Sequence, residues 1–551
     1  QAIDLTVHKG EVMALVGESG SGKSVTSMSI LQLLPAPPAT YTAGEILFSP
    51  DGRTQEDLLK KNKYDLQHIR GHLAAMIFQE PMTSLNPVMT CGKQVAEALI
   101  QHKKISAADA RMQAINWFSR VQLPDPEHMF DRYPHQLSGG QKQRVMIAMA
   151  MCCEPALLIC DEPTTALDVT VQQTILTLIK ELQQQTGMGV IFITHDLGVV
   201  AEIADRAAVM YKGEIVEENT IAALFQNPRH AYTRALLACR PVNHPRGSRL
   251  PVVSDFWEHG KEKTTASADP LPSENKTAAV FSEELVRVEN LSVHFPARRN
   301  FFGKPITYTR AVDNLSFSIF KGETLGLVGE SGCGKTTLGR TLLRLIDPTA
   351  GKIWYNGKEL TASKKTALSD LRQQIQIVFQ DPYSSLNPRI TIGEAIAEPL
   401  QVHRIGKNRA ARKEKVVALL EKVNLQADHY DRYPHEFSGG QRQRIVIARA
   451  LALSPSFVVC DESVSALDVS VQAQVLNLLN DLKKEFGFTI VFISHDLSVV
   501  RYISDRIMVM NKGKIEEAGL ADDIYLHPQT EYTRKLIAAI PKGLVPGGLL
   551  Q

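Results

Sequence analysis

The sequence predicts an α/β protein of two tandem domains, each built around a mainly parallel sheet. The first observation behind this prediction is an internal repeat: "YPHQLSGGQKQRVMIAMA" at 133–150 returns as "YPHEFSGGQRQRIVIARA" at 433–450. The second is that each copy contains an apolar strand, a glycine-rich turn and a helix in that order. The third is that two further apolar strands in each copy end in acidic residues or histidine, as strands of a parallel sheet do at a ligand-binding edge.

The repeat divides the chain of 551 residues, which is too long for one core, into two copies and a connection. Ser138 and Ser438 are 300 residues apart, whereas Lys23 and Lys335 are 312 apart, so the first copy carries extra residues between its lysine and its serine. We expect one domain at 1–241, a linker rich in Pro, Ser, Thr and charge at 242–283, and a second domain at 284–551 with a C-terminal extension. The second copy begins with an extra strand, "VRVENLSVHF", which the first copy lacks in this numbering.

Composition excludes several classes of protein. The chain is 44% hydrophobic and 22% charged, as a globular protein is, and its net charge of +2 gives no case for nucleic acid as a partner. No apolar run reaches the length of a membrane span. The seven cysteines show no metal-ligand or disulfide spacing, which favours a reducing compartment.

Each copy contains a turn that fits the pattern G-x-x-x-x-G-K-[ST]. Glycines in such a turn let backbone N–H groups surround a β-phosphate, the lysine reaches the β- and γ-phosphate oxygens, and the hydroxyl of the last residue is offered to Mg²⁺. A chance match is improbable because a strand and a helix flank the turn both times. The expected nucleotide-binding residues are Gly17, Glu18, Ser19, Gly20, Ser21, Gly22, Lys23 and Ser24, and Gly329, Glu330, Ser331, Gly332, Cys333, Gly334, Lys335, Thr336 and Thr337.

Two later strands in each copy supply candidate catalytic groups. "ALLICDE" and "SFVVCDE" place Asp161 and Asp461 where they would hold Mg²⁺ through water, and Glu162 and Glu462 where they would polarise an attacking water. "GVIFITHD" and "TIVFISHD" end in His195 and His495. A single histidine after an apolar strand is usually unremarkable, but its repetition at a matching distance from the Asp-Glu pair indicates a sensor of the γ-phosphate.

The repeated Ser-Gly-Gly turn opens a helix, and the free N–H groups of a helix N-terminus form an anion site. The order of the motifs, from glycine-rich loop to glutamine, SGGQ, Asp-Glu, "ALD" and histidine, resembles that of ABC-transporter ATPase domains over nearly the whole chain. The resemblance implies two P-loop NTPase (ABC ATPase) domains, each with an antiparallel β subdomain and a helical signature subdomain. It also implies ATP and Mg²⁺ as cofactors.

In that family the SGGQ segment of one domain faces the phosphate loop of the other, and ATP lies between them. Ser138, Gly139, Gly140 and Gln141 are therefore expected to cap the nucleotide at Lys335, and Ser438, Gly439, Gly440 and Gln441 the one at Lys23. The resemblance further implies that Gln79 and Gln380 contact Mg²⁺ and the attacking water, so that the metal sites comprise Ser24, Gln79, Asp161, Thr336, Gln380 and Asp461. Phe295 is the candidate for stacking on adenine, and Asp168 and Asp468 match aspartates that communicate across the interface.

Less universal phrases indicate the subfamily. "FQEPMTSLNP", "FQDPYSSLNP", "NPRHAYTRALL" and "HPQTEYTRKLI" resemble importers of dipeptides, oligopeptides, nickel and glutathione. The resemblance implies an ATPase that couples ATP hydrolysis to import at the cytoplasmic face of the bacterial inner membrane. It also implies two permease subunits as separate chains and, indirectly, a solute-binding protein. Only Cys239 lies near "YTRALL", so we expect no iron–sulfur cluster there.

Two alternatives remain at this point. A soluble tandem ABC protein acting on ribosomes or DNA is disfavoured, because its ribosomal members usually have a long charged helical linker and its DNA-repair members have zinc-binding cysteines. The fused ATPase of a sugar importer shares the layout, but its second domain commonly departs from the loop or signature patterns. Here both copies retain them.

Overall fold

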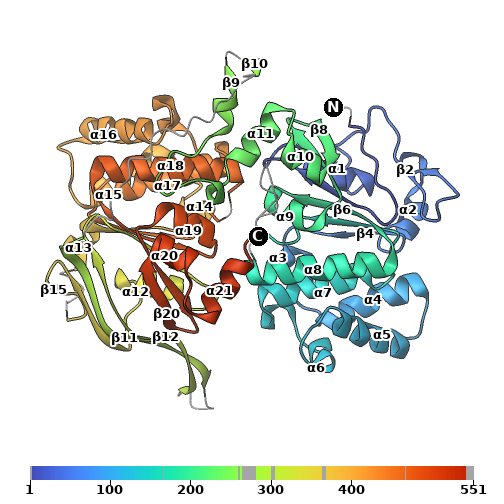
Figure 1. Cartoon of the computed structure of the whole chain (residues 1–551), viewed down its shortest axis with the longest axis horizontal. Coiled ribbons are helices and arrows are strands. Elements are labelled where there is room, and N and C mark those ends of the chain that lie inside the picture. The colour runs from blue at the N-terminus through green and yellow to red at the C-terminus, as the bar shows by residue number, and fades with distance from the viewer. Residues whose placement is uncertain are drawn as a thin grey trace.

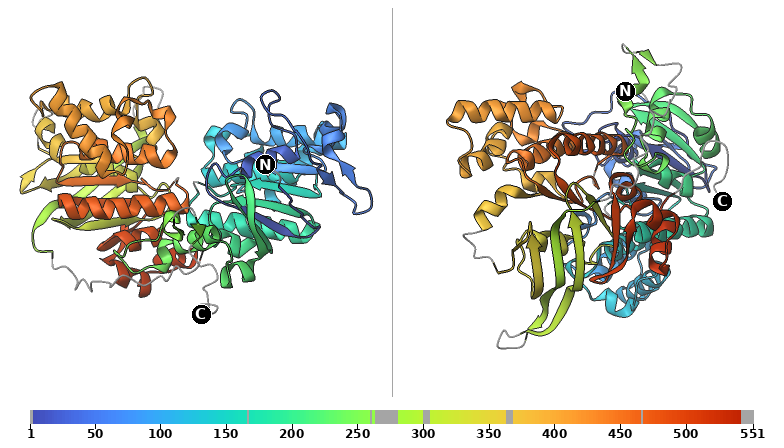
Figure 2. Two further views of the ribbon diagram at one scale, coloured as in Figure 1. Left: turned by 90° about the horizontal axis from the view of Figure 1, so that it is seen from above. Right: turned by 60° about the vertical axis from the view of Figure 1, so that its left-hand side comes forward.

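The computed structural model describes residues 3–165, 167–258, 261–262, 281–299, 305–362, 368–465 and 467–541. It consists of two similar α/β halves side by side (Figures 1 and 2). The fold class predicted from the sequence is confirmed. The structure contains the parallel sheets, the antiparallel sheet of the second half and, between Gln79 or Gln380 and the SGGQ segment that follows, the helices of the helical subdomain. Within the described residues, none of the helices is long and apolar enough to cross a bilayer.

The first half comprises residues from the N-terminus to α11. Its strands are β1 (Val12–Val16), β2 (Leu47–Phe48), β3 (Glu56–Asp57), β4 (Ala74–Ile77), β5 (Leu157–Asp161), β6 (Gly189–Thr194), β7 (Arg206–Tyr211) and β8 (Glu214–Thr220). Its helices are α1 (Lys23–Ile30), α2 (Lys63–Ile69), α3 (Pro81–Ser84), α4 (Cys91–Lys103), α5 (Ala107–Arg120), α6 (Pro126–Phe130), α7 (Gly139–Met151), α8 (Val169–Thr186), α9 (Leu197–Ile203), α10 (Ile221–Gln226) and α11 (Ala231–Ala238).

The second half repeats this order and adds a long hairpin at its start. Its strands are β11 (Glu284–Arg299), β12 (Pro305–Phe320), β13 (Thr324–Val328), β14 (Ala350–Tyr355), β15 (Lys358–Glu359), β16 (Ile375–Val378), β17 (Phe457–Asp461), β18 (Thr489–Ser494), β19 (Arg506–Asn511) and β20 (Lys514–Leu520). Its helices are α12 (Lys335–Leu342), α13 (Leu368–Gln374), α14 (Pro382–Ser385), α15 (Ile392–Val402), α16 (Arg409–Lys422), α17 (Gly439–Leu451), α18 (Val469–Phe486), α19 (Leu497–Ile503), α20 (Ala521–Leu526) and α21 (Glu531–Ala538).

The two six-stranded sheets have the same topology. Their strand orders are β4-β5-β6-β1-β7-β8 and β16-β17-β18-β13-β19-β20, and only the last pair of each sheet is antiparallel. Helices cover both faces, so β1 and β6 are buried along their whole length and are apolar without alternation. Because β5, β6 and β1 are neighbours and parallel, their carboxyl ends bring the acidic pair, the histidine and the glycine-rich loop to one edge.

The extra strand predicted for the second copy lies within β11. It pairs with β12 and β14 in a four-stranded antiparallel sheet of order β12-β11-β14-β15, which Figure 2 shows beside the parallel core. In the first half, residues 3–8 form no strand, although Ile3, Leu5 and Val7 pack against the core.

The beginning of the segment expected to be a linker is docked onto the second half. After the 3₁₀ turn Pro241–Asn243, the fully buried Leu250 pairs through its N–H and carbonyl with the side chain of Asn477, at 2.9 and 2.8 Å. Arg246 forms an ion pair with Asp505, and Tyr502 donates to the carbonyl of Ser248. A short hairpin, β9 (Trp257–Glu258) with β10 (Lys261–Glu262), follows, and residues 263–280 lie outside the described part.

Candidate active sites

Both glycine-rich loops have the same conformation. Lys23 is the first residue of α1 and is 4% exposed; its Nζ donates to the carbonyls of Gly17 at 2.7 Å and Glu18 at 2.9 Å. A Cβ atom added at Gly17 would lie 2.3 Å from the carbonyl oxygen of Met210, so no other residue fits there without movement. The hydroxyl of Ser21 is buried and has no hydrogen-bond partner among the described atoms, as expected for a group that awaits a phosphate oxygen.

The loop of the second half repeats these contacts. Lys335 begins α12 and donates to the carbonyls of Gly329 at 2.6 Å and Glu330 at 2.9 Å. A Cβ atom at Gly329 would lie 2.2 Å from the carbonyl oxygen of Met510. Cys333 occupies the position of Ser21, and burial raises the pKa of its thiol, which therefore remains protonated and acts as a small filler of the turn.

A hydroxyl and a carboxylate meet beside each loop. Ser24 donates to Asp161 at 3.0 Å, and Thr336 donates to Asp461 at 2.9 Å. Burial raises the pKa of both aspartates. The second carboxylate oxygen of Asp461 is buried and accepts no hydrogen bond among the described residues. An oxygen-only donor set fits a hard cation such as Mg²⁺. In the second half, Arg340 lies 3.7 Å from this carboxylate oxygen and partly balances its charge.

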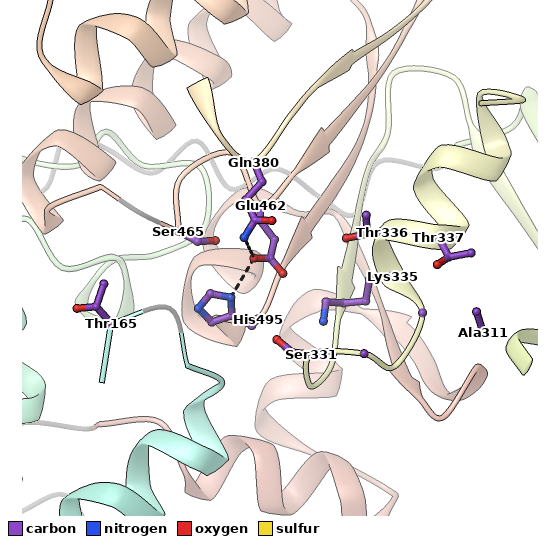
Figure 3. Close-up of a pocket in the computed structure, with 12 residues that line it drawn as sticks. Thr165, Ala311, Ser331, Lys335, Thr336, Thr337, Gln380, Glu462, Ser465 and His495 are labelled. Carbon is purple, nitrogen blue, oxygen red and sulfur yellow. Dashed lines mark hydrogen bonds and ion pairs between the residues drawn. The ribbon is translucent and has the colours of Figure 1, made fainter. Parts of the chain in front are cut away.

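The glutamate, glutamine and histidine of each half lie together. In the second half, Nε2 of Gln380 donates to Glu462 Oε2 at 2.8 Å, and Nδ1 of His495 lies 3.5 Å from the same oxygen (Figure 3). In the first half, Gln79 donates to Glu162 at 3.1 Å and His195 lies 3.5 Å away.

The electrostatics of these pairs hold the glutamates ionised. Burial raises the pKa of Glu162, but the hydrogen bond and charge of His195, with smaller effects from Thr165 and Lys23, outweigh burial and lower that pKa to about 2. Burial lowers the pKa of His195, and the contact with Glu162 reverses this effect, so the pKa ends above its ordinary value. The directions are the same for Glu462 and His495. Each site thus contains a carboxylate able to accept a proton and an imidazole able to donate one.

A cavity of about 300 Å³ adjoins Lys335. The lining residues that Figure 3 labels include Thr165, which comes from the first half, and the predicted Lys335, Thr336, Thr337, Gln380, Glu462 and His495. Thr165, Ala311 and Ser465 line this cavity and were missed in the sequence. The position of Ser465, shared with Thr165 in "TTALD" and "VSALD", could have indicated it, whereas nothing marks Ala311.

The structure does not bring the SGGQ segments to this cavity. Ser138 caps α7: its hydroxyl accepts from the Gln141 N–H at 3.3 Å, and the Gln141 side chain accepts from the Ser138 N–H at 3.0 Å. Ser438 and Gln441 do the same at 3.4 and 3.0 Å. Both serines are exposed, and neither segment is among the residues that line the cavity. Their facing of the opposite nucleotide therefore remains a prediction.

Contacts across the interface are present among the described residues, and the one made by Asp168 was expected from the sequence. Asp168 accepts hydrogen bonds from the backbone N–H and the hydroxyl of Ser331, both at 2.6 Å. Thr170 donates to Glu330 at 2.7 Å, and Ser470 donates to Glu18. Phe295, on β11 opposite Thr309, is 41% exposed and does not line the described cavity, so its stacking on adenine stays a prediction.

Comparison with known proteins identifies the family. The family model described as "ABC transporter" matches residues 1–165 and 312–465, which is more than half of the chain. The chain belongs to the ABC transporter family. A second model, "Oligopeptide/dipeptide transporter, C-terminal region", matches residues 216–255. As a member with two ATP-binding regions, the chain is a nucleotide-binding ATPase whose hydrolysis is coupled to solute import.

Several curated relatives extend along nearly the whole chain. The Glutathione import ATP-binding protein GsiA of Escherichia coli (strain K12) is 50% identical over 98% of this chain and 86% of its own length. The protein of the same name from Shigella sonnei (strain Ss046) has the same identity and coverage. Among solved structures, a dimeric ATP-binding cassette in a post-hydrolysis state with ADP and phosphate is 28% identical over 43% of this chain and 99% of that chain, with a TM-score of 0.39.

Proposed function

We propose that this ABC ATPase energises the import of glutathione or similarly short peptides, bound peripherally at the cytoplasmic face of the bacterial membrane to two separate permease chains. The observation that carries the proposal is the combination of two complete catalytic sets with the oligopeptide/dipeptide region at 216–255. A relative named for glutathione import, 50% identical over 98% of the chain, supports this class of solute.

The two halves act as domains, for which we propose the limits 1–241 and 284–551. Each uses its own phosphate loop and acidic pair. The SGGQ segment of the partner half is proposed to complete the site when the halves close over ATP. Thr165 already lines the cavity at Lys335 from the opposite half, so closure needs to add the signature segment to a site that is partly shared.

Hydrolysis follows from the residues of each half. Ser24 with Asp161, and Thr336 with Asp461, would hold Mg²⁺, which would neutralise charge on the phosphates. Glu162 and Glu462, kept ionised by the adjacent histidines, accept a proton from the attacking water. The histidines, whose pKa values are raised, can donate to the γ-phosphate. Gln79 and Gln380 hold the glutamates until nucleotide and water compete for them.

The loop after each glutamine is the proposed contact with the permeases. In the second half this loop lines a cavity of about 500 Å³ together with Glu398 and Arg449, and Tyr383 in it is 63% exposed. A short cytoplasmic helix of a permease can enter such a cavity. The position next to Gln380 suits the transmission of closure from nucleotide to transporter.

The test is reconstitution in liposomes with permease chains encoded beside this protein, and with a binding protein loaded with glutathione or with a sugar. Glutathione is expected to stimulate ATPase activity several-fold and to accumulate inside, and the Lys23→Ala/Lys335→Ala variant should do neither. A cysteine at Tyr383 should crosslink to permease cytoplasmic loops with a yield that changes on ATP binding. ATPase activity that is indifferent to permeases, with the chain sedimenting on ribosomes, would refute the proposal in favour of the soluble class.

A further inference from the structure

Glu18, the second residue of the first phosphate loop, is held at three points by three different elements. Its backbone N–H donates to the hydroxyl of Tyr232 on α11 at 2.9 Å. Its carbonyl accepts from Nζ of Lys23 at 2.9 Å. Its carboxylate accepts from the hydroxyl of Ser470, which belongs to α18 of the opposite half. One loop residue therefore joins the C-terminal helix of its own half, the phosphate-binding lysine and the partner half.

The same arrangement recurs in the second loop. The N–H of Glu330 donates to the hydroxyl of Tyr532 on α21 at 3.2 Å, and its carbonyl accepts from Lys335 at 2.9 Å. Its carboxylate accepts from Thr170 of α8 at 2.7 Å. Two copies that differ in sequence preserve one geometry, so the contacts do not depend on a single side-chain placement. Figure 1 shows α21 beside α8, with which it is in contact, and α11 contacts α18 in the same way.

Opposing electrostatic effects act on the Glu18 carboxylate. Burial and the neighbouring Asp468 raise its pKa, whereas Lys23 and Tyr232 lower it. Thr170 and Ser470 lie in the first turn of α8 and α18, where the helix dipole stabilises a negative charge. Tyr232 is fully buried, and its ring lies 4.4 Å from that of Tyr211, so its hydroxyl is fixed where the loop amide needs an acceptor. Burial of Glu18 would be costly without these partners, because a buried carboxylate needs hydrogen bonds.

We propose that Tyr232 and Tyr532 are positioning residues that hold each phosphate loop in register with the opposite half, through Glu18 and Glu330 respectively. The helix that Glu18 reaches begins at Val469, directly after the loop that follows Glu462 of the other ATP site. Binding of nucleotide at the Lys23 loop is thereby linked to the segment that contains Glu462 in the Lys335 site. In the same way, Glu330 links binding at the Lys335 loop to the segment that contains Glu162 in the Lys23 site. This inference rests on the proposed ATPase cycle and gives the "YTRALL" and "YTRKLI" motifs a role in it.

The consequence is a specific pattern of coupling. Tyr232 should act together with Ser470, because both hold Glu18, and Tyr532 together with Thr170, because both hold Glu330. The mismatched pairs share no partner and should act independently. A tyrosine that merely stabilised its own half would show no preference between Ser470 and Thr170.

The experiment is a pair of double-mutant cycles on the full chain, with kcat and KM for MgATP as readouts. Tyr232→Phe and Ser470→Ala are each expected to lower kcat/KM by about fivefold, the value of one hydrogen bond. The two together should cost well below the product of the single effects. Tyr232→Phe with Thr170→Ala is the matched control and should give the full product.

Glu18→Gln serves as a second variant if Tyr232→Phe folds poorly. Glu18→Gln retains the backbone hydrogen bonds to Tyr232 and Lys23 and weakens only the side-chain hydrogen bond to Ser470. In this background the further effect of Ser470→Ala on kcat/KM should be smaller than in the wild-type chain, with no loss of secondary structure. Equal coupling in matched and mismatched pairs, or additivity in both, would overturn the proposal. A wild-type chain without ATPase activity would instead refute the proposed function, so the two failures are distinguishable.

Discussion

Asn477 is predicted to fasten the connection between the halves, and its replacement by Ala should release it. Asn477 is 8% exposed, and its side chain satisfies both the N–H and the carbonyl of Leu250, which is fully buried. A buried backbone group left without a partner costs about 1–3 kcal/mol. Two backbone groups lose their partner in this variant, and water that enters the vacated space replaces part of the lost hydrogen bonding. We therefore expect a loss of about 2–4 kcal/mol in the free energy of docking this segment.

The assay is hydrogen–deuterium exchange of the segment around Leu250. Because each 1.4 kcal/mol corresponds to a factor of ten, the amide of Leu250 should exchange about 30- to 1000-fold faster in the Asn477→Ala variant. Trp257, which comes after the docked segment in the chain, packs against the first half, with its ring 5.9 Å from that of Tyr211, so its fluorescence measures whether release of the segment reaches this contact.

Asn480→Ala is the matched control, one turn along α18. Asn480 is only partly buried, and its one hydrogen bond within the described part, to the hydroxyl of Tyr502, is 3.4 Å long. Both substitutions gain the same helix propensity, so this effect cancels in the comparison. Exchange at Leu250 that is no faster in Asn477→Ala than in Asn480→Ala would refute the assignment of these hydrogen bonds.

Three further predictions concern the ATP sites. Glu162→Gln with Glu462→Gln should lower ATPase turnover by at least about 100-fold while ATP affinity measured by equilibrium binding changes little; undiminished turnover would mean that another group polarises the water. Arg340 lies 3.7 Å from Asp461, and Met28 takes its place in the first half. Because Arg340 competes with a cation for that carboxylate, Arg340→Met should lower the Mg²⁺ concentration for half-maximal activity by about two- to fivefold. An increase in that concentration would contradict this prediction. The loss of stability in His495→Gln should be largest between about pH 4.5 and 6.5, the ordinary pKa values of Glu and His. The stabilisation from the raised pKa of His495 is lost as the pH rises through that pKa. The stabilisation from the lowered pKa of Glu462 is lost as the pH falls through that pKa. Urea unfolding of both chains from pH 3 to 9 measures this difference, and one that grows above pH 8 would be inconsistent with the pair.

The groups of each predicted site lie together in the structure because they follow parallel neighbouring strands, while their catalytic roles stay predictions. An apolar strand that ends in Asp-Glu, beside one that ends before His, can place its terminal groups only at the same sheet edge as the glycine-rich loop. The contacts of Glu462 with Gln380 and His495 follow from this topology. The same reasoning placed Ser24 against Asp161 and Thr336 against Asp461.

Apart from that of Asp168, which the "ALD" motif marked, contacts between the halves could not be derived from the sequence, because they depend on rigid-body placement and on single side chains that no pattern marks. The sequence assigned Gly140 and Gly440 to an anion site, but the structure gives them a second role. A Cβ atom at either glycine would lie 2.6 or 2.2 Å from a methyl carbon of Val171 or Val471, so glycine lets the start of α7 and α17 approach the following long helix.

The same lack of a pattern explains why the docked segment around Leu250 was interpreted as a linker. Its composition is that of a mobile connection, yet one buried asparagine on α18 satisfies its backbone, and the residue that provides this partner lies 227 positions away. Composition reports how much apolar surface a segment can bury by itself, not whether a distant side chain pairs with its backbone. The docked residues follow α11 after the 3₁₀ turn Pro241–Asn243, and α11 carries the tyrosine that accepts from Glu18. The connection and the phosphate loop therefore belong to one continuous set of contacts. The docking of Leu250 should therefore matter for ATP affinity as well as for stability, and Asn477→Ala is expected to raise KM for MgATP where Asn480→Ala does not. Equal KM values in the two variants would show that the tether and the loop are energetically separate.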